Sequence, residues 1–192
     1  MSRRVSSLLI ALLALATTAL ASSRPTSVAS LLQSEENIAF LTAPERVEAF
    51  ILTAKEPLFR KKSGKRRYVE SDGRALAAPA AERLRLRLAR DDNYRWHTET
   101  AGEPSWNVRV KFFRGDQFLS ADFSFESGLV LFARDGLPFS AEDYVDPDDE
   151  FFALLRAAFP KEKSLRAVAA ALEARQKERA ARNAAFEKAA GG

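Results

Sequence analysis

Residues 106–135 constrain the fold more than any other part of the chain. This stretch contains three apolar-rich runs separated by two short turn signals, Gly115-Asp116 and Glu126-Ser127-Gly128. In the first two runs apolar and polar residues alternate. Because side chains on a strand point to opposite faces in turn, each run predicts a strand with one apolar and one polar face. The stretch therefore predicts a three-stranded antiparallel meander that packs on one side only. The residues expected on its polar face are Asn107, Arg109, Lys111, Ser120, Asp122 and Ser124.

The rest of the chain adds shorter strands and several helices. Residues 50–54 and 68–71 are rich in β-formers and predict two further strands, and the connection from 136 to 147 is expected to be a loop. Thr42-Ala43-Pro44-Glu45 resembles a helix start, which predicts one or two helical turns to residue 49. We therefore expect a single α+β domain, with an antiparallel sheet of about five strands, the meander at its centre and helices packed on one face.

Residues 79–90 admit two interpretations. Ala81, Leu84 and Leu88 fall on one helical stripe, whereas the repeated Leu-Arg pairs also fit the period of a strand. Pro79 suits the first turn of a helix and the alanines favour helix, so we predict a helix.

Two helices are expected at the C-terminal end. Acidic residues at 146–150 favour a helix start, and Pro160 ends the helix that follows. A longer helix is predicted over 164–190. Its apolar stripe stops halfway, so we expect its first half to be docked and its second half to be solvated. The stripe consists of Leu165, Val168, Ala169 and Leu172.

The amino-terminal segment predicts export. Arg3-Arg4 precede an apolar run that ends in Ala19-Leu20-Ala21, which is the pattern of a secretory signal peptide cleaved after Ala21. The alternative is a retained membrane anchor, which the shortness of the run and Thr17-Thr18 disfavour. We therefore expect a periplasmic or extracellular protein that contacts the membrane only through this signal. The expected organisation is a signal at 1–21, a polar leader with a possible short helix at 22–40, the α+β domain at 41–160, and a charged C-terminal helix at 161–192.

Composition narrows the chemistry. The 192-residue chain has no cysteine, which excludes disulfides, thiol catalysis and a lipid anchor on cysteine. The net charge is +4, and it falls to +2 without Arg3 and Arg4, since 28 basic residues then face 26 acidic ones. The position of the charges therefore matters more than their sum.

The densest basic cluster lies at residues 60–67, around a Ser-Gly turn between two expected strands. Such a patch attracts a polyanion or an acidic protein surface. The alternative, which we favour, is a solvated loop tip. Specific nucleic-acid recognition is not expected, because aromatic residues occur only at the ends of the cluster. The candidate binding residues are Arg60, Lys61, Lys62, Lys65, Arg66 and Arg67.

Other candidate sites are weaker. His97, the single histidine, lies near Asp91, Asp92 and Glu99, yet it lacks the partners of a catalytic centre. The acids at 142–150 do not match a calcium loop and are explained by helix capping. Arg114-Gly115-Asp116 is the adhesion tripeptide, but a tight turn between strands explains it. The aromatic residues of the meander favour a core over a ligand cavity. We expect no catalytic residue, metal or cofactor.

The order of several short patterns resembles a group of small exported bacterial proteins of uncharacterised function. These patterns are Val47-Glu48-Ala49-Phe50, Asp91-Asp92-Asn93-Tyr94, Val108-x-Val-x-Phe112 and a Phe-x-Leu-Leu-x-x-Ala-Phe-Pro segment from Phe152 to Pro160. The resemblance covers about residues 41–160 and implies export and the order of elements. Many such proteins carry Cys-Phe-x-Cys in the second meander strand, where this chain has Asp122-Phe123-Ser124-Phe125, so no metal or redox role carries over.

Three functions follow as hypotheses. The first is a non-enzymatic binding module that uses the exposed sheet face or the basic loop. The second is an inhibitor or accessory factor of an envelope hydrolase. The third, which we disfavour, is an enzyme that uses His97 and nearby acids.

Overall fold

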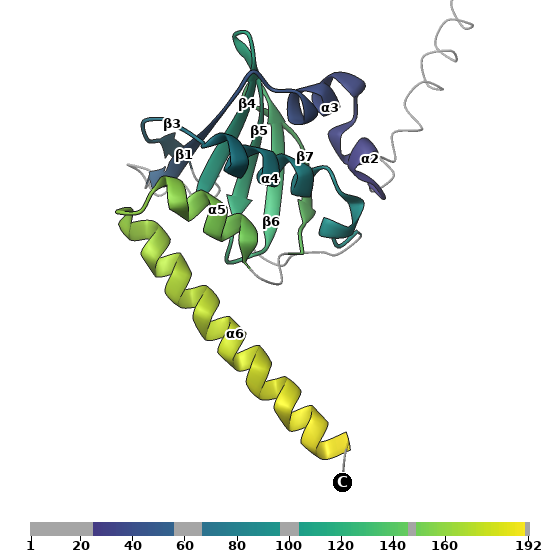
Figure 1. Ribbon diagram of the computed structural model, residues 1–192, viewed down its shortest axis with the longest axis vertical. Coiled ribbons are helices and arrows are strands. Elements are labelled where there is room, and N and C mark those ends of the chain that lie inside the picture. Colours follow the sequence, from purple (N-terminus) through teal and green to yellow (C-terminus); the bar gives the residue numbers. More distant parts are fainter. Residues whose placement is uncertain (1–24, 56–66, 97–103, 146–148, 191–192) are drawn as a thin grey trace, which may run out of the picture.

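The computed structural model describes residues 25–55, 67–96, 104–145 and 149–190 and shows an α+β fold (Figure 1). Its seven-stranded antiparallel sheet has the order β2-β1-β4-β5-β6-β7, and β3 pairs with β1. The strands are β1 (Arg46–Lys55), β2 (Arg67–Glu70), β3 (Arg74–Ala75), β4 (Val108–Arg114), β5 (Gln117–Ser124), β6 (Leu129–Arg134) and β7 (Leu137–Asp143). The helices are α2 (Val28–Leu32), α3 (Glu35–Thr42), α4 (Ala78–Leu88), the 3₁₀ helix η1 (Asp91–Asn93), α5 (Glu150–Ala158) and α6 (Lys163–Ala190).

The predicted fold class, the antiparallel sheet and the meander are confirmed. The meander is β4-β5-β6, with Arg109 opposite Asp122 in the β4–β5 pair. The sheet has more strands than the five or so expected. One reason is that residues 137–143 form β7 instead of a loop. Asp135 and Gly136 have φ angles of 48° and 84° and connect β6 to β7 in a two-residue turn. Asp-Gly is a strong signal for this turn.

The hydrophobic core lies between the helices and one face of the sheet (Figure 1). Alternate residues of β1, β4, β5 and β6 point into it, as their period of two requires. Phe112, Phe123, Phe125 and Phe132 are core residues, as expected, whereas Phe118 is half-buried on the opposite face, where it packs against Phe113. The fully buried large side chains of the sheet are Phe112, Leu119, Phe123 and Phe132.

The segment expected to hold one short helix contains two, α2 and α3. Ser27 and Ser34 cap them by accepting hydrogen bonds from backbone amides of the first turns. Leu31, Leu32 and Phe40 are buried in the core. The packed core therefore includes residues that precede position 41, and the helical part of the expected leader belongs to the folded domain.

The prediction of a helix that starts at Thr42 is wrong. Thr42 ends α3, and β1 begins at Arg46. Val47, Ala49 and Ile51 are buried in alternation on β1, and this period of two outweighs the local helix-start signal around Pro44. The strand expected at 50–54 is thus present but begins four residues earlier.

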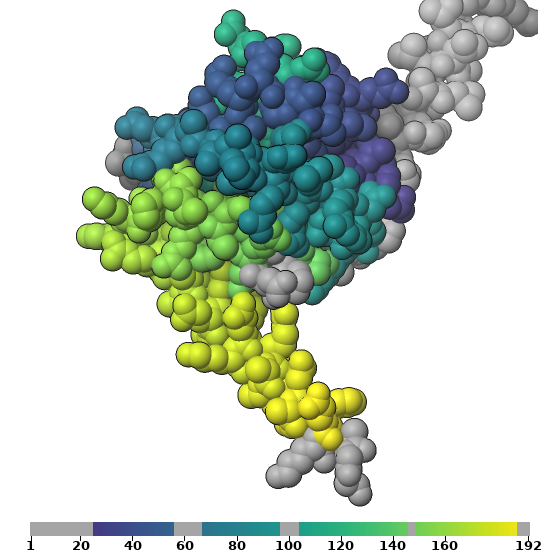
Figure 2. Space-filling model, in the orientation of Figure 1, coloured from purple at the N-terminus to yellow at the C-terminus, as the bar shows by residue number. Residues whose placement is uncertain are grey.

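The helices at 79–90 and at the C-terminus are confirmed. Leu84 and Leu88 of α4 are fully buried. The expected stripe of α6 is buried in the core cluster, and from residue 176 to 187 the helix is exposed. This exposed part projects beyond the domain in Figures 1 and 2. Within the described residues, no helix has both the length and the apolar character needed to cross a bilayer.

The expectation that the meander packs on one side only is wrong for β5. Ser120, Asp122 and Ser124, which alternate with its core residues, are also buried. This strand lies inside the sheet between β4 and β6, so longer neighbouring side chains cover its small polar ones. The hydroxyl groups of Ser120 and Ser124 have no hydrogen-bond partner within the described part of the chain.

An ion-pair network neutralises the buried charge on this face. Arg109 Nε and Nη2 donate to the two carboxylate oxygens of Asp122 at 2.6 and 2.5 Å, and its Nη1 donates to Glu70 at 2.6 Å. Lys111 donates to the other oxygen of Glu70 at 2.7 Å and lies 4.5 Å from the ring centre of Phe50. Burial raises the pKa of Asp122, and Arg109 opposes that rise. Hydrogen bonds to Asp122 raise the pKa of Arg109, so its positive charge is secured.

We predict that Arg109→Leu destabilises the protein by about 3 kcal/mol, because it leaves the Asp122 carboxylate buried without its partner. The double variant Arg109→Leu/Asp122→Leu should recover most of this loss, since no lone charge remains. Urea unfolding at pH 7 measures the free energy of unfolding of the single and the double variant. Arg90→Leu is the control: it removes an exposed pair with Asp92 and should cost much less than Arg109→Leu, because solvent screens an exposed pair. Equal losses in Arg109→Leu and Arg90→Leu would contradict the structural role of the network.

Candidate functional site

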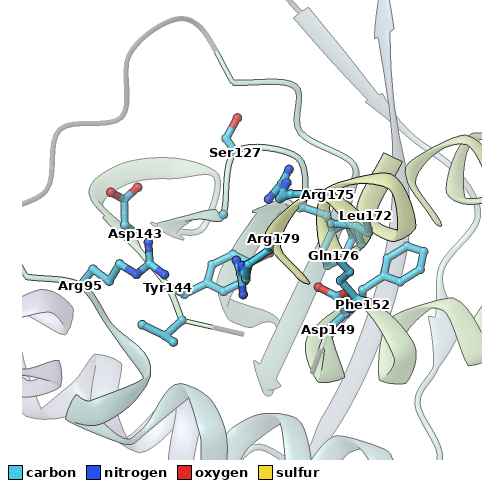
Figure 3. Close-up of a pocket in the computed structure, with 13 residues that line it drawn as sticks. Arg95, Ser127, Asp143, Tyr144, Asp149, Phe152, Leu172, Arg175, Gln176 and Arg179 are labelled. Atoms are coloured by element: carbon cyan, nitrogen blue, oxygen red, sulfur yellow. Dashed lines mark hydrogen bonds between the residues drawn. The ribbon is translucent and has the colours of Figure 1, made fainter. Parts of the chain in front are cut away.

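A charged cleft of about 300 Å³ lies where the β5–β6 turn, the end of β7, the start of α5 and the middle of α6 meet. Figure 3 shows arginine and aspartate side chains around this opening. Aromatic side chains from α5 and from the residues directly after β5 and β7 form part of its lining. The charged lining residues are Arg95, Asp143, Asp149, Arg175 and Arg179, and the aromatic ones are Phe125, Tyr144 and Phe152.

Helix α6 forms the basic wall of the cleft. Arg175 and Arg179 are four residues apart and therefore share one helix face with Leu172, which is buried against the core. Arg175 Nη2 donates to the backbone oxygen of Glu126 in the β5–β6 turn, which fixes the helix against the turn. That acceptor carries no charge. Arg179 is exposed at the mouth of the cleft and has no ion pair within the described residues.

The opposite wall is built by the segment that follows α4. Tyr94 pairs with Tyr144 in an isolated antiparallel bridge, and Arg95 N donates to the backbone oxygen of Asp143 at 2.9 Å. The Tyr94 hydroxyl donates to Leu88 O at 2.8 Å and the ring stacks on Trp96. Burial, with a smaller contribution from Asp91, raises the pKa of Tyr94, which therefore stays neutral. These contacts hold Arg95 at the cleft.

The start of α5 closes the third side. Gln176 Nε2 donates to Asp149 Oδ2 at 2.5 Å, so a side chain of α6 holds the residue that precedes α5. Glu150 accepts hydrogen bonds from Arg83, at 2.6 Å, and from Arg87. The bond from Arg87 is the main cause that lowers the pKa of Glu150 below its ordinary value. Arg83 and Arg87 of α4 thus anchor the start of α5.

The cleft combines three guanidinium groups with two carboxylates, so its described lining has an excess of one positive charge. Guanidinium groups present several N–H donors in a planar fork that matches carboxylate and phosphate oxygens. The recess lowers the local dielectric and strengthens such contacts relative to open solvent. Chemically, the arrangement is suited to binding an anionic group.

Most of the binding residues expected from the sequence lie outside the described residues, namely Arg60, Lys61, Lys62, Lys65 and Arg66. Arg67 is described: it is exposed at the start of β2, opposite Lys55 of β1. The β1–β2 pairing confirms that the basic segment connects two antiparallel strands. The binding role of the loop stays a prediction.

His97 and Glu99 also lie outside the described residues. Of the acids near them in sequence, Asp91 accepts a hydrogen bond from Val28 N at 2.6 Å and Asp92 pairs with Arg90. Asp91 therefore holds α2 on the domain, which is a structural role.

The other motifs have structural explanations. Arg114-Gly115-Asp116 forms the β4–β5 turn, with Gly115 at a φ of 59°, which glycine adopts readily. In the acidic segment, Glu142 is buried in β7, Glu150 binds two arginines of α4, and Asp149 binds Gln176. Within the described residues no group of three histidine, cysteine or acidic side chains could hold a metal ion.

The cleft arginines were not identified from the sequence. Arg175 and Arg179 follow the apolar stripe of α6 at the same helical spacing, which is the signal that could have located them. Arg95 had no comparable signal, because only the Tyr94–Tyr144 bridge brings it to the cleft.

The chain matches no protein-family model, no curated protein and no solved structure. The resemblance to small exported bacterial proteins therefore stays an expectation.

We predict that Glu150→Gln destabilises the protein by about 1 kcal/mol at pH 7, because the charge that binds Arg83 and Arg87 is lost. The pKa of Glu150 is lowered on folding, so the contribution of its charge is present above the ordinary value of 4.5 and is lost as the pH falls through the folded value. The difference between the two proteins should therefore be constant well above pH 4.5 and should shrink as the pH falls below 4.5.

Thermal unfolding from pH 7 to pH 3 checks this dependence. Glu173→Gln, at an exposed position of α6, serves as the control and should differ little from the unmodified protein at any pH. A destabilisation by Glu150→Gln that is constant with pH would contradict the ion pair as its cause.

Proposed function

We propose that the protein is a non-enzymatic binding module that takes an anionic group of its partner in the cleft between α6 and the end of β7. The observation that carries this proposal is the position of Arg175 and Arg179. Both guanidinium groups line a recess, and neither has a carboxylate partner among the described residues. Export, which the amino-terminal segment predicts, would place the partner in the periplasm or outside the cell.

The physical basis is the cost of keeping such charges together. Two guanidinium groups one helical turn apart repel each other, and an isolated helix loses a few tenths of a kcal/mol to such a pair. An anion between them replaces the repulsion by two charge-assisted hydrogen bonds. The recess excludes part of the solvent, so the gain exceeds that of an exposed surface pair.

The surroundings of the cleft also support binding. Its walls are fixed by hydrogen bonds from Gln176 to Asp149 and from Arg175 to the β5–β6 turn, so Arg175 is already ordered before association. Preorganisation of this kind reduces the entropy lost on binding. Phe125, Tyr144 and Phe152 add apolar surface beside the charges.

We predict that Arg175→Ser/Arg179→Ser weakens binding of a fluorescent hexaglutamate peptide about tenfold at low salt, which corresponds to about 1.4 kcal/mol for two charge-assisted contacts. Fluorescence anisotropy measures the affinity, and rising NaCl should weaken binding of the unmodified protein more than that of the variant.

The matched control is Arg166→Ser/Lys177→Ser, which removes the same charge from the opposite face of α6. Both control residues are exposed. Its affinity should change less than about twofold, since screened charges outside the cleft contribute little. Equal losses in the two double variants would show attraction by net charge alone and would overturn the proposal.

The basic loop at 60–67 provides the competing site. Replacing Arg60, Lys61, Lys62, Lys65, Arg66 and Arg67 by Ser should leave the cleft affinity within a few-fold if the cleft binds the peptide. Loss of binding in this variant, with the cleft variant unaffected, would assign the anion to the loop.

A further inference from the structure

One face of α6 carries a continuous series of residues at alternating spacings of three and four. Over three heptads this spacing keeps side chains on one seam of a helix, as in a coiled coil. The seam of α6 consists of Leu165, Val168, Leu172, Arg175, Arg179, Arg182 and Phe186.

The seam changes character along the helix. Leu165, Val168 and Leu172 are buried against the domain. Arg175 and Arg179 then line the cleft, and the seam continues beyond the domain to Phe186, whose side chain is 75% exposed. Figures 1 and 2 show this end of α6 projecting away from the sheet. The face that forms the cleft wall is therefore also the face presented by the projecting arm.

The charges on the seam indicate what can cover it. Arg182 has only a loose, exposed pair with Glu178 at 3.8 Å on its own helix, which contributes little. A second copy of α6 would place arginines opposite arginines at the seam positions, and like charges in such contacts are unfavourable. A segment with carboxylates at the matching positions would satisfy all three arginines.

Phe186 adds an apolar requirement. It lies four residues beyond Arg182, or about 6 Å along the helix, and the distance from Arg175 to Phe186 is about 16 Å. Exposed phenylalanine on a helix is a typical anchor for a partner, because aromatic side chains contribute much of the binding energy at interfaces.

We infer that the partner is a protein segment, about three helical turns long, that presents acidic side chains to Arg175, Arg179 and Arg182 and an apolar side chain to Phe186. This inference rests on the proposed function, because the acidic end of the segment enters the cleft. It goes further in assigning the projecting arm of α6 as the second half of the docking surface.

The experiment uses the full chain and two synthetic helical peptides of 21 residues. The first carries Glu at three successive seam positions and Leu at the next, and the second has Ser in place of that Leu. Affinities are measured by fluorescence anisotropy for the unmodified protein and for Phe186→Ser, Arg182→Ser and Arg175→Ser/Arg179→Ser. The control is Leu137→Ser, which removes a side chain that is also 75% exposed but lies on β7.

We expect Phe186→Ser to weaken the leucine peptide about fivefold and to leave the serine peptide unchanged, because the apolar contact exists only in the first. Arg182→Ser should weaken both peptides about threefold, and Arg175→Ser/Arg179→Ser should weaken both about tenfold. Leu137→Ser should change neither.

The outcomes separate the two proposals. Losses with Arg175→Ser/Arg179→Ser but no effect of Phe186→Ser or Arg182→Ser would overturn the docking surface and leave the cleft proposal standing. No effect of any of these variants would overturn both. If the protein binds phosphatidylglycerol vesicles through Phe186 but does not bind the leucine peptide, the partner is a membrane surface and the inference is overturned. A dimer that depends on Phe186, measured by sedimentation velocity, would also overturn it.

Discussion

The carboxylate of Asp122 lies in the interior of the sheet with only 2% of the residue exposed, and the arrangement of the neighbouring strands depends on neutralising it. A buried lone charge is costly, so β4 must place Arg109 opposite Asp122. A shift of one residue would turn every side chain of the strand to the other face. Arg109 also binds Glu70, which ties β2 into the same network. The polar face is thereby fixed, and the helices collect on the apolar one.

This division of the sheet sets the position of the cleft. With the helices on one face, α5 and the first half of α6 lie over the end of the sheet where β7 and the β5–β6 turn meet. Residues distant in sequence, such as Arg95, Asp143 and Arg175, come together there. Beyond that point no part of the described domain covers α6, so its charged seam passes from the cleft into solvent.

The meander and the long helices could be predicted because their periodicities extend over many residues, as in Val108, Val110 and Phe112. Thr42 misled the prediction because a local helix signal competed with the longer alternation of β1. The burial of Ser120 and Asp122 could not be predicted, since it depends on which strands flank β5. The cleft was missed for the same reason: Arg95 reaches it only through a tertiary bridge.

The central claim is that Arg175 and Arg179 directly bind an anionic group, with the β5–β6 turn holding Arg175 and Gln176 holding the start of α5. Arginine side-chain NMR tests it most directly, because the Nε–H resonance responds to a carboxylate at hydrogen-bond distance. On addition of hexaglutamate, we predict that the resonances of Arg175 and Arg179 shift and that of Arg166 does not. Uniform small shifts of all three resonances, or none, would contradict the claim.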